Sequence, residues 1–362
     1  RGICGPDDAA VRIGGDEFLY LAMAPASNIE QLSRRAEELL GKLSHPVSSD
    51  GRRLNVTPSI GIARWPYDTE NIHGLMKFAD LAMYEAKAAG RNQYCFFEPW
   101  MNESHKNELE LLTELREGLD AGQFEVHYQP RLDAKTKKIT AVEALARWHH
   151  PKRGLVYPAD FIPLCEKSGL IKKLGAVVLQ TAIKQHRKWR KQGHCITVAV
   201  NVSQRQLNTE DFAEDVEQVI CNCGCEGKYL ELEMTETLVV EGSETVHTNI
   251  ERVRQMGVRV AIDDFGTGYS NFARLNDMAV DCIKIDRSLV LGLPDTEGLL
   301  KIVVAMCRMM NVTIVAEGIE TAEADNKILE LECDELQGFY YARPMPADGV
   351  TQLLIKTDPG SK

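Results

Sequence analysis

From residue 122 onward, short apolar segments alternate with segments of helical periodicity, and this alternation strongly limits the possible folds. Strands that alternate with helices favour parallel βαβ units in an α/β domain. Eight strand candidates in roughly 240 residues favour a closed (β/α)8 barrel over an open sheet. The eight candidates are FEVHYQP, ITAVEALARW, CITVAVNVS, YLELEMTE, VRVAIDDFG, DCIKID, VTIVAEG and ELQGFYYA, and the intervening helices include residues 173–192, 211–221, 244–256 and 297–310.

Residues 1–98 are organised differently. The segment VRIGGDEFLYL at 11–21 predicts a β-hairpin that displays Asp16 and Glu17 at its turn. Helical and strand patterns are mixed in the rest of this part, which predicts an α+β domain. The predicted helices cover residues 28–44 and 72–89, and the predicted strand covers residues 54–64 with Pro58 inside it.

Residues 99–121 separate the two parts. This segment is polar and has helical periodicity, with Leu109, Leu112 and Leu115 on one stripe. Such a pattern suits a helix that connects two domains. We therefore expect a first domain over 1–98, a connecting helix over 99–121 and a barrel over 122–355.

The charge balance of the chain limits its ligands. Its 362 residues include 42 Lys and Arg against 53 Asp and Glu, a net charge of −11. This excess of acidic residues disfavours binding to DNA or RNA, because phosphate contacts need clustered cations. A small anionic ligand would need local Arg, Lys or metal ions.

Hydropathy and cysteine usage indicate a cytoplasmic protein. No apolar run approaches the roughly 18 residues that a membrane span requires, and the first residues lack the apolar core of a signal peptide. The ten cysteines follow no framework spacing, which suits a reducing cytosol. A sensor or membrane anchor could precede Arg1, in which case this chain would be the cytoplasmic part of a larger protein. Cys221, Cys223 and Cys225 could bind a soft metal, but a surface loop is the favoured interpretation.

Polar side chains stand at the carboxyl ends of the predicted barrel strands, where the active sites of such barrels lie. Five carboxylates and one amide converging there would repel one another unless a cation lies among them. Because all the ligands are oxygens, Mg²⁺, Mn²⁺ or Ca²⁺ is favoured over Zn²⁺, and two adjacent aspartates could help to hold a second ion. The strand-end residues are Gln129, Glu143, Asn201, Glu233, Asp263 with Asp264, Lys284, Glu317 and Gln337.

Lys284 has two possible functions. A barrel lysine can form a Schiff base, but that chemistry needs a lowered pKa, and the neighbouring acids should keep this lysine charged. A charged lysine suits the positioning of water or the neutralisation of phosphate. Two ions that share a carboxylate can activate water and clamp a displacement at phosphorus, so the predicted reaction is phosphodiester hydrolysis. Gly266 and Gly268 after the fifth strand predict a loop that orders on binding.

These residues resemble the EAL family of cyclic di-GMP phosphodiesterases over about residues 120–350. The tripeptide EAL stands at 143–145, and RW follows at 147–148. The resemblance implies a TIM-like barrel that opens cyclic di-GMP to linear pGpG with Mg²⁺ or Mn²⁺. The chain also carries, in the family's order, HYQP, PADFIPLCEKSGLI, NVS, LEMTE, DDFGTGYS, IKID, AEG and QG.

The resemblance also implies residue roles. Lys284 resembles the residue that binds the attacking water, and Glu236 resembles the acid that steadies the DDFGTG loop. Glu143, whose loss should abolish catalysis, is also a ligand of the first metal. Asn271 departs from the serine that the family usually has in GYSS. The expected metal ligands are Glu143, Asn201, Glu233 and Asp263 for the first ion and Asp264 and Glu317 for the second, and the expected substrate contacts are Gln129, Leu145, Arg147, Asp286 and Gln337.

The first domain resembles the C-terminal part of a GGDEF domain, the diguanylate cyclase family. RIGGDEF, SIGIA and ADLAMYEAKAAGRN carry this match. Asp16 and Glu17 correspond to its acidic signature, and Lys87 and Arg91 resemble its phosphate contacts. The family's earlier metal-binding and guanine-reading segment is absent from this chain, and the Arg-x-x-Asp motif reads GPDD at residues 5–8. We therefore expect no cyclase activity and a regulatory or structural role for this remnant.

The leading hypothesis is an active cyclic di-GMP phosphodiesterase that forms a homodimer. One alternative is a non-catalytic cyclic di-GMP receptor that signals through the connecting helix. Missing ligands would indicate such a receptor, and every expected ligand is present. A second alternative is a bifunctional enzyme that also makes cyclic di-GMP, which GTP consumption would reveal.

Overall fold

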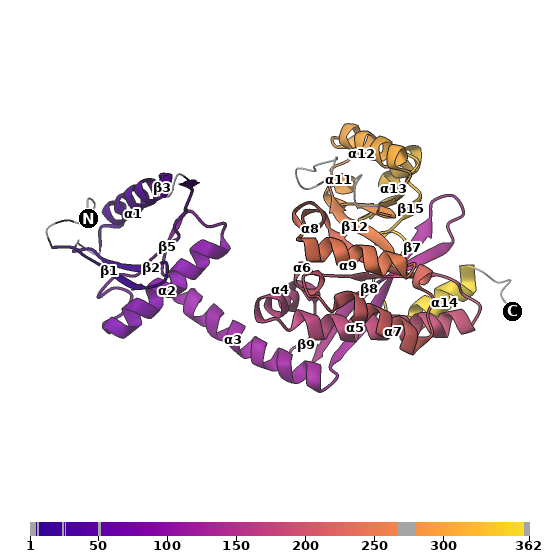
Figure 1. Cartoon of the computed structure of the whole chain (residues 1–362), viewed down its shortest axis with the longest axis horizontal. Helices are drawn as coiled ribbons and strands as arrows, with labels where there is room; N and C mark the ends of the chain where they lie inside the picture. Colours follow the sequence, from indigo (N-terminus) through magenta and orange to yellow (C-terminus); the bar gives the residue numbers. More distant parts are fainter. Residues whose placement is uncertain are drawn as a thin grey trace. The chain divides into compact units, whose positions relative to one another are not determined.

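The computed structural model describes residues 5, 7–23, 25, 27–49, 52–266 and 280–357. The chain divides into two compact units, residues 1–111 and 112–362, and each is described by itself (Figure 1). Within the described part of the chain, none of the helices combines the length and the apolar character needed to span a bilayer.

The first unit contains short two-stranded sheets and helices. The predicted hairpin is confirmed as β1 (Ala9–Gly14) paired antiparallel with β2 (Glu17–Leu21). The predicted helices are confirmed as α1 (Ile29–Leu43) and α2 (Ile72–Ala88). The other elements are β3 (Val47–Ser49) paired with β4 (Arg52–Leu54), β5 (Ile60–Ile62) paired parallel with β6 (Tyr94–Phe96), and the start of α3 (Pro99–Asp120).

The prediction of one strand over 54–64 is wrong. The chain leaves β4 at Leu54 and enters β5 at Ile60, and the residues between them belong to no strand. Pro58 lies in this gap and has no N–H to donate to a strand ladder, which accounts for the break. The small core of this unit packs Leu81 and Ala82 of α2 against Phe97 and Met101.

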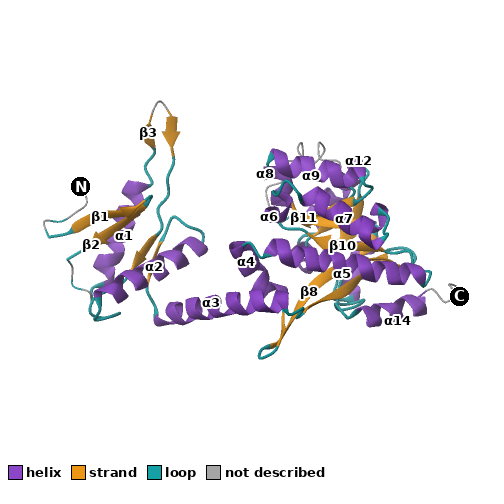
Figure 2. Cartoon of the chain, turned by 60° about the horizontal axis from the view of Figure 1, so that its bottom comes forward, coloured by secondary structure: helices purple, strands orange, loops and turns teal. Residues whose placement is uncertain are grey.

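The second unit contains a closed ring of eight strands with helices outside it (Figure 2). Hydrogen bonds run around the ring in the order β7, β8, β10, β11, β12, β13, β14, β15 and back to β7, and β9 extends the sheet beside β8. The predicted barrel is therefore confirmed. Its strands are β7 (Phe124–Asp133), β8 (Ile139–His150), β9 (Gly154–Val156), β10 (Thr197–Asn201), β11 (Leu230–Thr235), β12 (Arg259–Phe265), β13 (Cys282–Ile285), β14 (Thr313–Ala316) and β15 (Glu335–Leu336).

Most of the barrel helices follow the strands in βα units, and α5, for example, packs against β10 and α12 against β14. Gly169 and Gly224 end α4 and α7 in the left-handed conformation that favours glycine. The helices are α4 (Pro158–Ser168), α5 (Ile171–Lys191), α6 (Gln204–Leu207), α7 (Phe212–Cys223), α8 (Glu236–Glu241), α9 (Glu244–Gln255), α11 (Arg287–Leu291), α12 (Glu297–Met310), α13 (Ala322–Glu330) and α14 (Ala347–Thr357).

The expectation that all eight strands are parallel is wrong for the first of them. Strand β7 runs antiparallel to both of its neighbours, β8 and β15. Only residues 134–138 join β7 to β8, and such a short connection makes a hairpin rather than a crossover. Gln129 therefore lies in the middle of β7 and not at its carboxyl end.

The last predicted strand is also shorter than expected, because only Glu335 and Leu336 pair within the sheet. The chain then passes very close to the backbone that follows β14. A Cβ atom on Gly338 would lie 2.0 Å from the carbonyl oxygen of Ile319, so glycine is required there. This close approach sets the position of the preceding residue, Gln337.

Candidate active site

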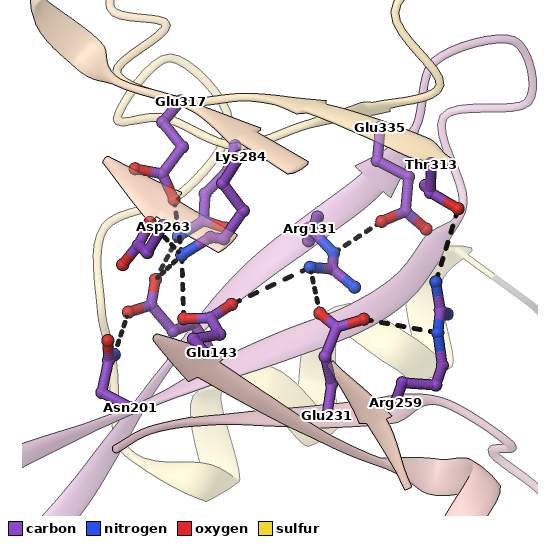
Figure 3. A network of polar contacts seen from close by, with 12 residues as sticks. Arg131, Glu143, Asn201, Glu231, Arg259, Asp263, Lys284, Thr313, Glu317 and Glu335 are labelled. Atoms are coloured by element: carbon purple, nitrogen blue, oxygen red, sulfur yellow. Dashed lines mark hydrogen bonds and ion pairs between the residues drawn. The ribbon is translucent and has the colours of Figure 1, made fainter. Parts of the chain in front are cut away.

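Several predicted site residues from different strands gather around Lys284, and Figure 3 labels Glu143, Asn201, Asp263 and Glu317 among them. Asn201 is the last residue of β10, and Glu233 lies near the end of β11. Glu143 on β8 faces Gln129 on β7 in the strand register, so the antiparallel strand also contributes a side chain at this level. The remaining members are Asp263 and Asp264 on β12, Lys284 on β13, Glu317 after β14 and Gln337 after β15.

Lys284 lies among four carboxylates and is fully buried. Its Nζ atom is 2.8 Å from Glu233 Oε2 and 2.7 Å from Glu317 Oε1. The same nitrogen is 3.0 Å from Asp263 Oδ1 and 3.7 Å from Glu143 Oε2. One lysine cannot balance four ionised carboxylates, so full ionisation of the cluster would leave an excess of negative charge.

Both carboxylate oxygens of Glu143 accept hydrogen bonds from amides. Asn201 Nδ2 donates to Oε1 at 2.7 Å, and Gln337 Nε2 donates to Oε2 at 2.6 Å. Gln337 Nε2 also lies 3.4 Å from Oε1 of Gln129. Glu143 is thus held in one orientation by side chains from two other strand ends.

The carboxylates form two overlapping groups that could each hold a metal ion. The first contains Glu143, Glu233 and Asp263, and the second contains Asp263, Asp264 and Glu317. In each group one oxygen per residue lies within 4.8 Å of the others, and Asp263 belongs to both. Oε1 of Glu233 is buried and accepts no hydrogen bond from any described residue. An oxygen-only donor set with an unsatisfied buried carboxylate oxygen fits a hard divalent cation such as Mg²⁺ or Mn²⁺.

The surroundings shift the pKa values of the clustered carboxyl groups in opposite directions. Burial raises the pKa of Glu233 well above its usual range and raises the pKa of Glu317 to about 8. Burial opposes ionisation of Glu143 as well, but Lys284 and the two amide donors lower its pKa overall. A bound cation would displace protons from the raised carboxyls.

Burial also opposes the charged form of Lys284. The surrounding carboxylates outweigh this effect and raise its pKa well above the usual value. The prediction that this lysine stays charged is therefore confirmed, and the Schiff-base alternative has no support.

A local distortion of β12 brings the two adjacent aspartates, Asp263 and Asp264, into the same carboxylate group. The pairing of β12 with β13 shifts register between Ile262 and Phe265, and Asp264 has a left-handed φ of 54°. Successive side chains of a regular strand point to opposite faces, so this break lets both Asp263 and Asp264 serve one site. The N–H of Asp264 donates to Asp263 Oδ1 at 3.1 Å.

Glu236 contacts the backbone of Gly266, the last described residue of the DDFGTG segment. Its Oε2 atom accepts a hydrogen bond of 3.3 Å from the N–H of Gly266, two residues after Asp264. Gly268 and Asn271 lie outside the described residues.

Three further predicted substrate contacts lie around the carboxylates. Leu145 and Arg147 follow Glu143 at alternate positions of β8, so all three face the same way. The guanidinium of Arg147 lies 5.4 Å from the ring centroid of Tyr157 and donates to the carbonyl of Ala146 at 2.8 Å. Asp286 follows β13 and caps α11 by accepting from the N–H of Ser288 at 2.9 Å.

Sequence reasoning missed a second polar group deeper in the barrel. Arg131 and Glu231 pair at 2.7 Å, Arg131 also pairs with Glu335, and Arg259 approaches Glu231 from the other side. The sequence signal was available, because Glu231 precedes Glu233 by two residues and Arg131 follows Gln129 by two. Charged residues at alternate positions of a buried strand share a face.

The structure does not bring the first-domain residues into a comparable cluster. Asp16 and Glu17 are exposed at the β1–β2 turn, Lys87 lies in the last turn of α2, and Arg91 follows that helix. Among the described residues, both groups of candidate metal-ligating side chains belong to the barrel.

The favoured surface-loop interpretation of the three clustered cysteines is wrong for two of them. Cys221 and Cys223 belong to the last turn of α7, and Cys225 follows the glycine that ends it. Cys221 is exposed whereas Cys223 is buried, so their thiols do not face one ligand. Across the described ranges, no metal-ligating group includes them.

Comparisons with known proteins match both parts of the chain. A family model described as "EAL domain" matches residues 112–344, and one described as "Diguanylate cyclase, GGDEF domain" matches residues 2–93. The chain is 40% identical over 347 residues to the bifunctional diguanylate cyclase/cyclic di-GMP phosphodiesterase MucR of Pseudomonas aeruginosa, a match that covers 94% of this chain and 50% of MucR. It is 37% identical over 346 residues to the cyclic di-GMP phosphodiesterase PdeR of Escherichia coli, covering 94% of this chain and 52% of PdeR.

A solved structure described as "PaMucR Phosphodiesterase, c-di-GMP complex" superposes with a TM-score of 0.64 at 38% identity. This superposition covers 67% of the present chain and 99% of the other. The chain spans about half the length of the curated relatives that it matches.

Proposed function

The chain belongs to the EAL domain family and carries a GGDEF domain before the barrel, and from this membership we propose that the barrel hydrolyses cyclic di-GMP to linear pGpG in bacterial second-messenger signalling. The single observation that carries the proposal is the cluster of Lys284 with Glu143, Glu233, Asp263 and Glu317 at the carboxyl end of the barrel. The relatives named as cyclic di-GMP phosphodiesterases, and the structure with that ligand, support the choice of substrate.

The proposed site holds two divalent cations, Mg²⁺ or Mn²⁺. Asp263 belongs to both carboxylate groups, so it would help to hold either ion. When bound, such ions neutralise the phosphate and make water a better nucleophile at neutral pH. The proposed ligands are Glu143, Asn201, Glu233 and Asp263 for one ion and Asp263, Asp264 and Glu317 for the other.

The chain's own side chains have separate roles in this proposal. Lys284 keeps its proton and donates a hydrogen bond that orients the attacking water, since a charged ammonium cannot act as the base. Glu236 holds the backbone at Gly266 and thereby steadies the loop that begins there. Gln129, Leu145, Arg147, Asp286 and Gln337 contact the substrate.

The experiment is product analysis on the purified chain with cyclic di-GMP and Mg²⁺ or Mn²⁺. We expect pGpG with either metal, no product after chelation, and no turnover by Glu143→Ala. Glu330→Ala is the matched control, because Glu330 is exposed on α13 and pairs only with Lys327 at 2.8 Å among the ion pairs of the described residues. Robust turnover by Glu143→Ala would refute the assignment, and tight binding without hydrolysis would support a receptor instead.

We further propose that the GGDEF domain is regulatory or structural and that the chain acts as a homodimer in the cytoplasm. Asp16 and Glu17 stand exposed at a hairpin turn, outside the metal-ligating groups of the described residues. The chain should therefore consume no GTP, and formation of cyclic di-GMP from GTP would contradict this part of the proposal. Light scattering of the purified chain tests the dimer.

A further inference from the structure

The floor of the site is formed by eight residues, one from each strand of the ring. Each lies two positions deeper in the barrel than a site residue that belongs to the same strand or directly follows it, so it shares the inward face of that strand. On five strands the floor residue is small or apolar, and all five are buried. These are Ala141, Ala199, Ala261, Cys282 and Val315, and the other three floor residues are Arg131, Glu231 and Glu335.

The three charged floor residues pair across the barrel interior (Figure 3). Arg131 Nη1 lies 2.7 Å from Glu231 Oε1, and Arg131 Nε lies 2.6 Å from Glu335 Oε2. Arg131 comes from β7 and Glu231 from β11, with two strands of the ring between them. The small side chains of the other floor residues leave the space that this long side chain needs.

Arg131 also approaches a proposed metal ligand from below. Its Nη1 atom lies 3.9 Å from Glu233 Oε1, the buried oxygen that accepts no hydrogen bond from the described residues. The other oxygen, Oε2, lies 2.8 Å from Lys284. The carboxylate of Glu233 is therefore held between two buried cations, one at the level of the site and one in the floor.

We propose that Arg131 is a positioning residue that sets the orientation of the Glu233 carboxylate for metal binding. This inference rests on the proposed function, because it takes Glu233 as a ligand. Charge balance within the floor does not require the contact, since Arg131 and Arg259 already match Glu231 and Glu335. Removal of groups that orient metal ligands typically weakens metal binding by about 10- to 100-fold.

The test measures Mn²⁺ binding by the full chain, from the loss of the signal of free Mn²⁺ in electron paramagnetic resonance. Arg131→Met alone leaves Glu335 without its cation and Glu231 with Arg259 alone, and can unfold the barrel. The decisive variant therefore replaces the whole group as Arg131→Met, Glu231→Leu and Glu335→Leu, because an apolar substitute for a buried ionic group often keeps stability. Arg131→Lys keeps the positive charge but loses the forked guanidinium group. Arg259→Met is the matched control, since Arg259 also pairs with Glu231, at 3.4 Å, but is in no ion pair with Glu233 among the described residues.

We expect the triple variant to keep the circular dichroism spectrum of the unchanged chain and to bind Mn²⁺ about 10- to 100-fold more weakly. Arg131→Lys should bind with intermediate affinity, and Arg259→Met should bind as the unchanged chain does. The ratio kcat/KM of the triple variant should recover at high Mn²⁺. A folded triple variant that binds Mn²⁺ within about threefold of the unchanged chain overturns the inference, and so does equal weakening by Arg259→Met.

If the triple variant fails to fold, the Mn²⁺ affinity of Arg131→Lys is the deciding measurement. An affinity equal to that of the unchanged chain overturns the inference. The proposed function fails separately. An unchanged chain that binds Mn²⁺ but does not hydrolyse cyclic di-GMP refutes the activity, whereas the Mn²⁺ measurements still test Arg131.

Discussion

Gln337 donates a hydrogen bond of 2.6 Å to Oε2 of Glu143, and this bond joins the end of β15 to β8 across the mouth of the barrel. Asn201 donates to the other oxygen of the same carboxylate. An amide can hold a carboxylate in place without adding charge, so Glu143 remains available to a cation. The orientation of this ligand therefore depends on two neutral side chains.

Replacing Gln337 by Leu should weaken metal binding and catalysis by about 10- to 100-fold, because Oε2 of Glu143 loses its amide donor. Mn²⁺ titration and kcat/KM for cyclic di-GMP measure the effect. Gln255→Leu is the control, since Gln255 is exposed at the end of α9. Equal Mn²⁺ affinity in Gln337→Leu and Gln255→Leu would show that the hydrogen bond does not orient the ligand.

Replacing Lys284 by Met should destabilise the metal-free chain by about 3–5 kcal/mol, because a buried carboxylate cluster loses its cation. Mn²⁺ should then raise the unfolding temperature more in this variant than in the unchanged chain, while turnover is lost. Thermal unfolding with and without Mn²⁺ measures both effects.

The control for this experiment is Lys301→Met. Lys301 is exposed on α12 and pairs with Glu297 one helical turn away, so its loss should cost less than about 0.5 kcal/mol. If Lys284→Met has the stability of Lys301→Met without metal, the carboxylates do not depend on the lysine for charge balance.

Most of the site could be predicted because barrel chemistry lies at the carboxyl ends of strands. Asn201 ends β10, Glu317 follows β14, and Glu233 and Asp263 each lie two residues before the end of their strands. Their convergence therefore follows from the topology alone. Gln129 reaches the same level for another reason. It lies in the middle of an antiparallel strand, and the hairpin register places it opposite Glu143.

The direction of β7 and the charged floor were harder to predict. The five-residue connection after β7 indicates a hairpin, but the regular alternation elsewhere favoured a uniform parallel barrel. Arg131 and Glu231 lie in strands whose other inward residues are also polar. The two residues pair with each other although they are 100 residues apart in the sequence. Whether two such residues meet depends on the order of the strands around the ring, and the sequence of a single strand does not reveal that order.

Gly338→Ala should destabilise the barrel by at least about 1–3 kcal/mol, because the added Cβ would lie 2.0 Å from the carbonyl oxygen of Ile319. The backbone displacement that relieves this contact would also move Gln337, so the affinity for Mn²⁺ should fall together with the stability. Gly298→Ala on α12 is the opposite case. Its Cβ would meet no atom within 4 Å, and it should stabilise the chain by about 0.4–1 kcal/mol. Urea unfolding compares the two, and equal effects would contradict the role of the close approach.

The stability of the barrel should depend on pH through His186, which is buried on α5. Burial and the nearby Arg190 lower its pKa below 6.5, and Glu226 opposes this effect. The ring packs on Tyr229, and Nδ1 lies 3.4 Å from the thiol of Cys225. The neutral ring is therefore the form that the folded chain accommodates.

Because the unfolded chain binds the proton at higher pH than the folded chain, stability should fall as pH drops through about 6.5 toward the lowered pKa of His186. His186→Phe cannot take up a proton and should lose less stability over this range. Urea unfolding of both chains between pH 5 and 8 measures the difference in slope. Parallel curves would show that His186 takes up its proton equally in the folded and unfolded chains.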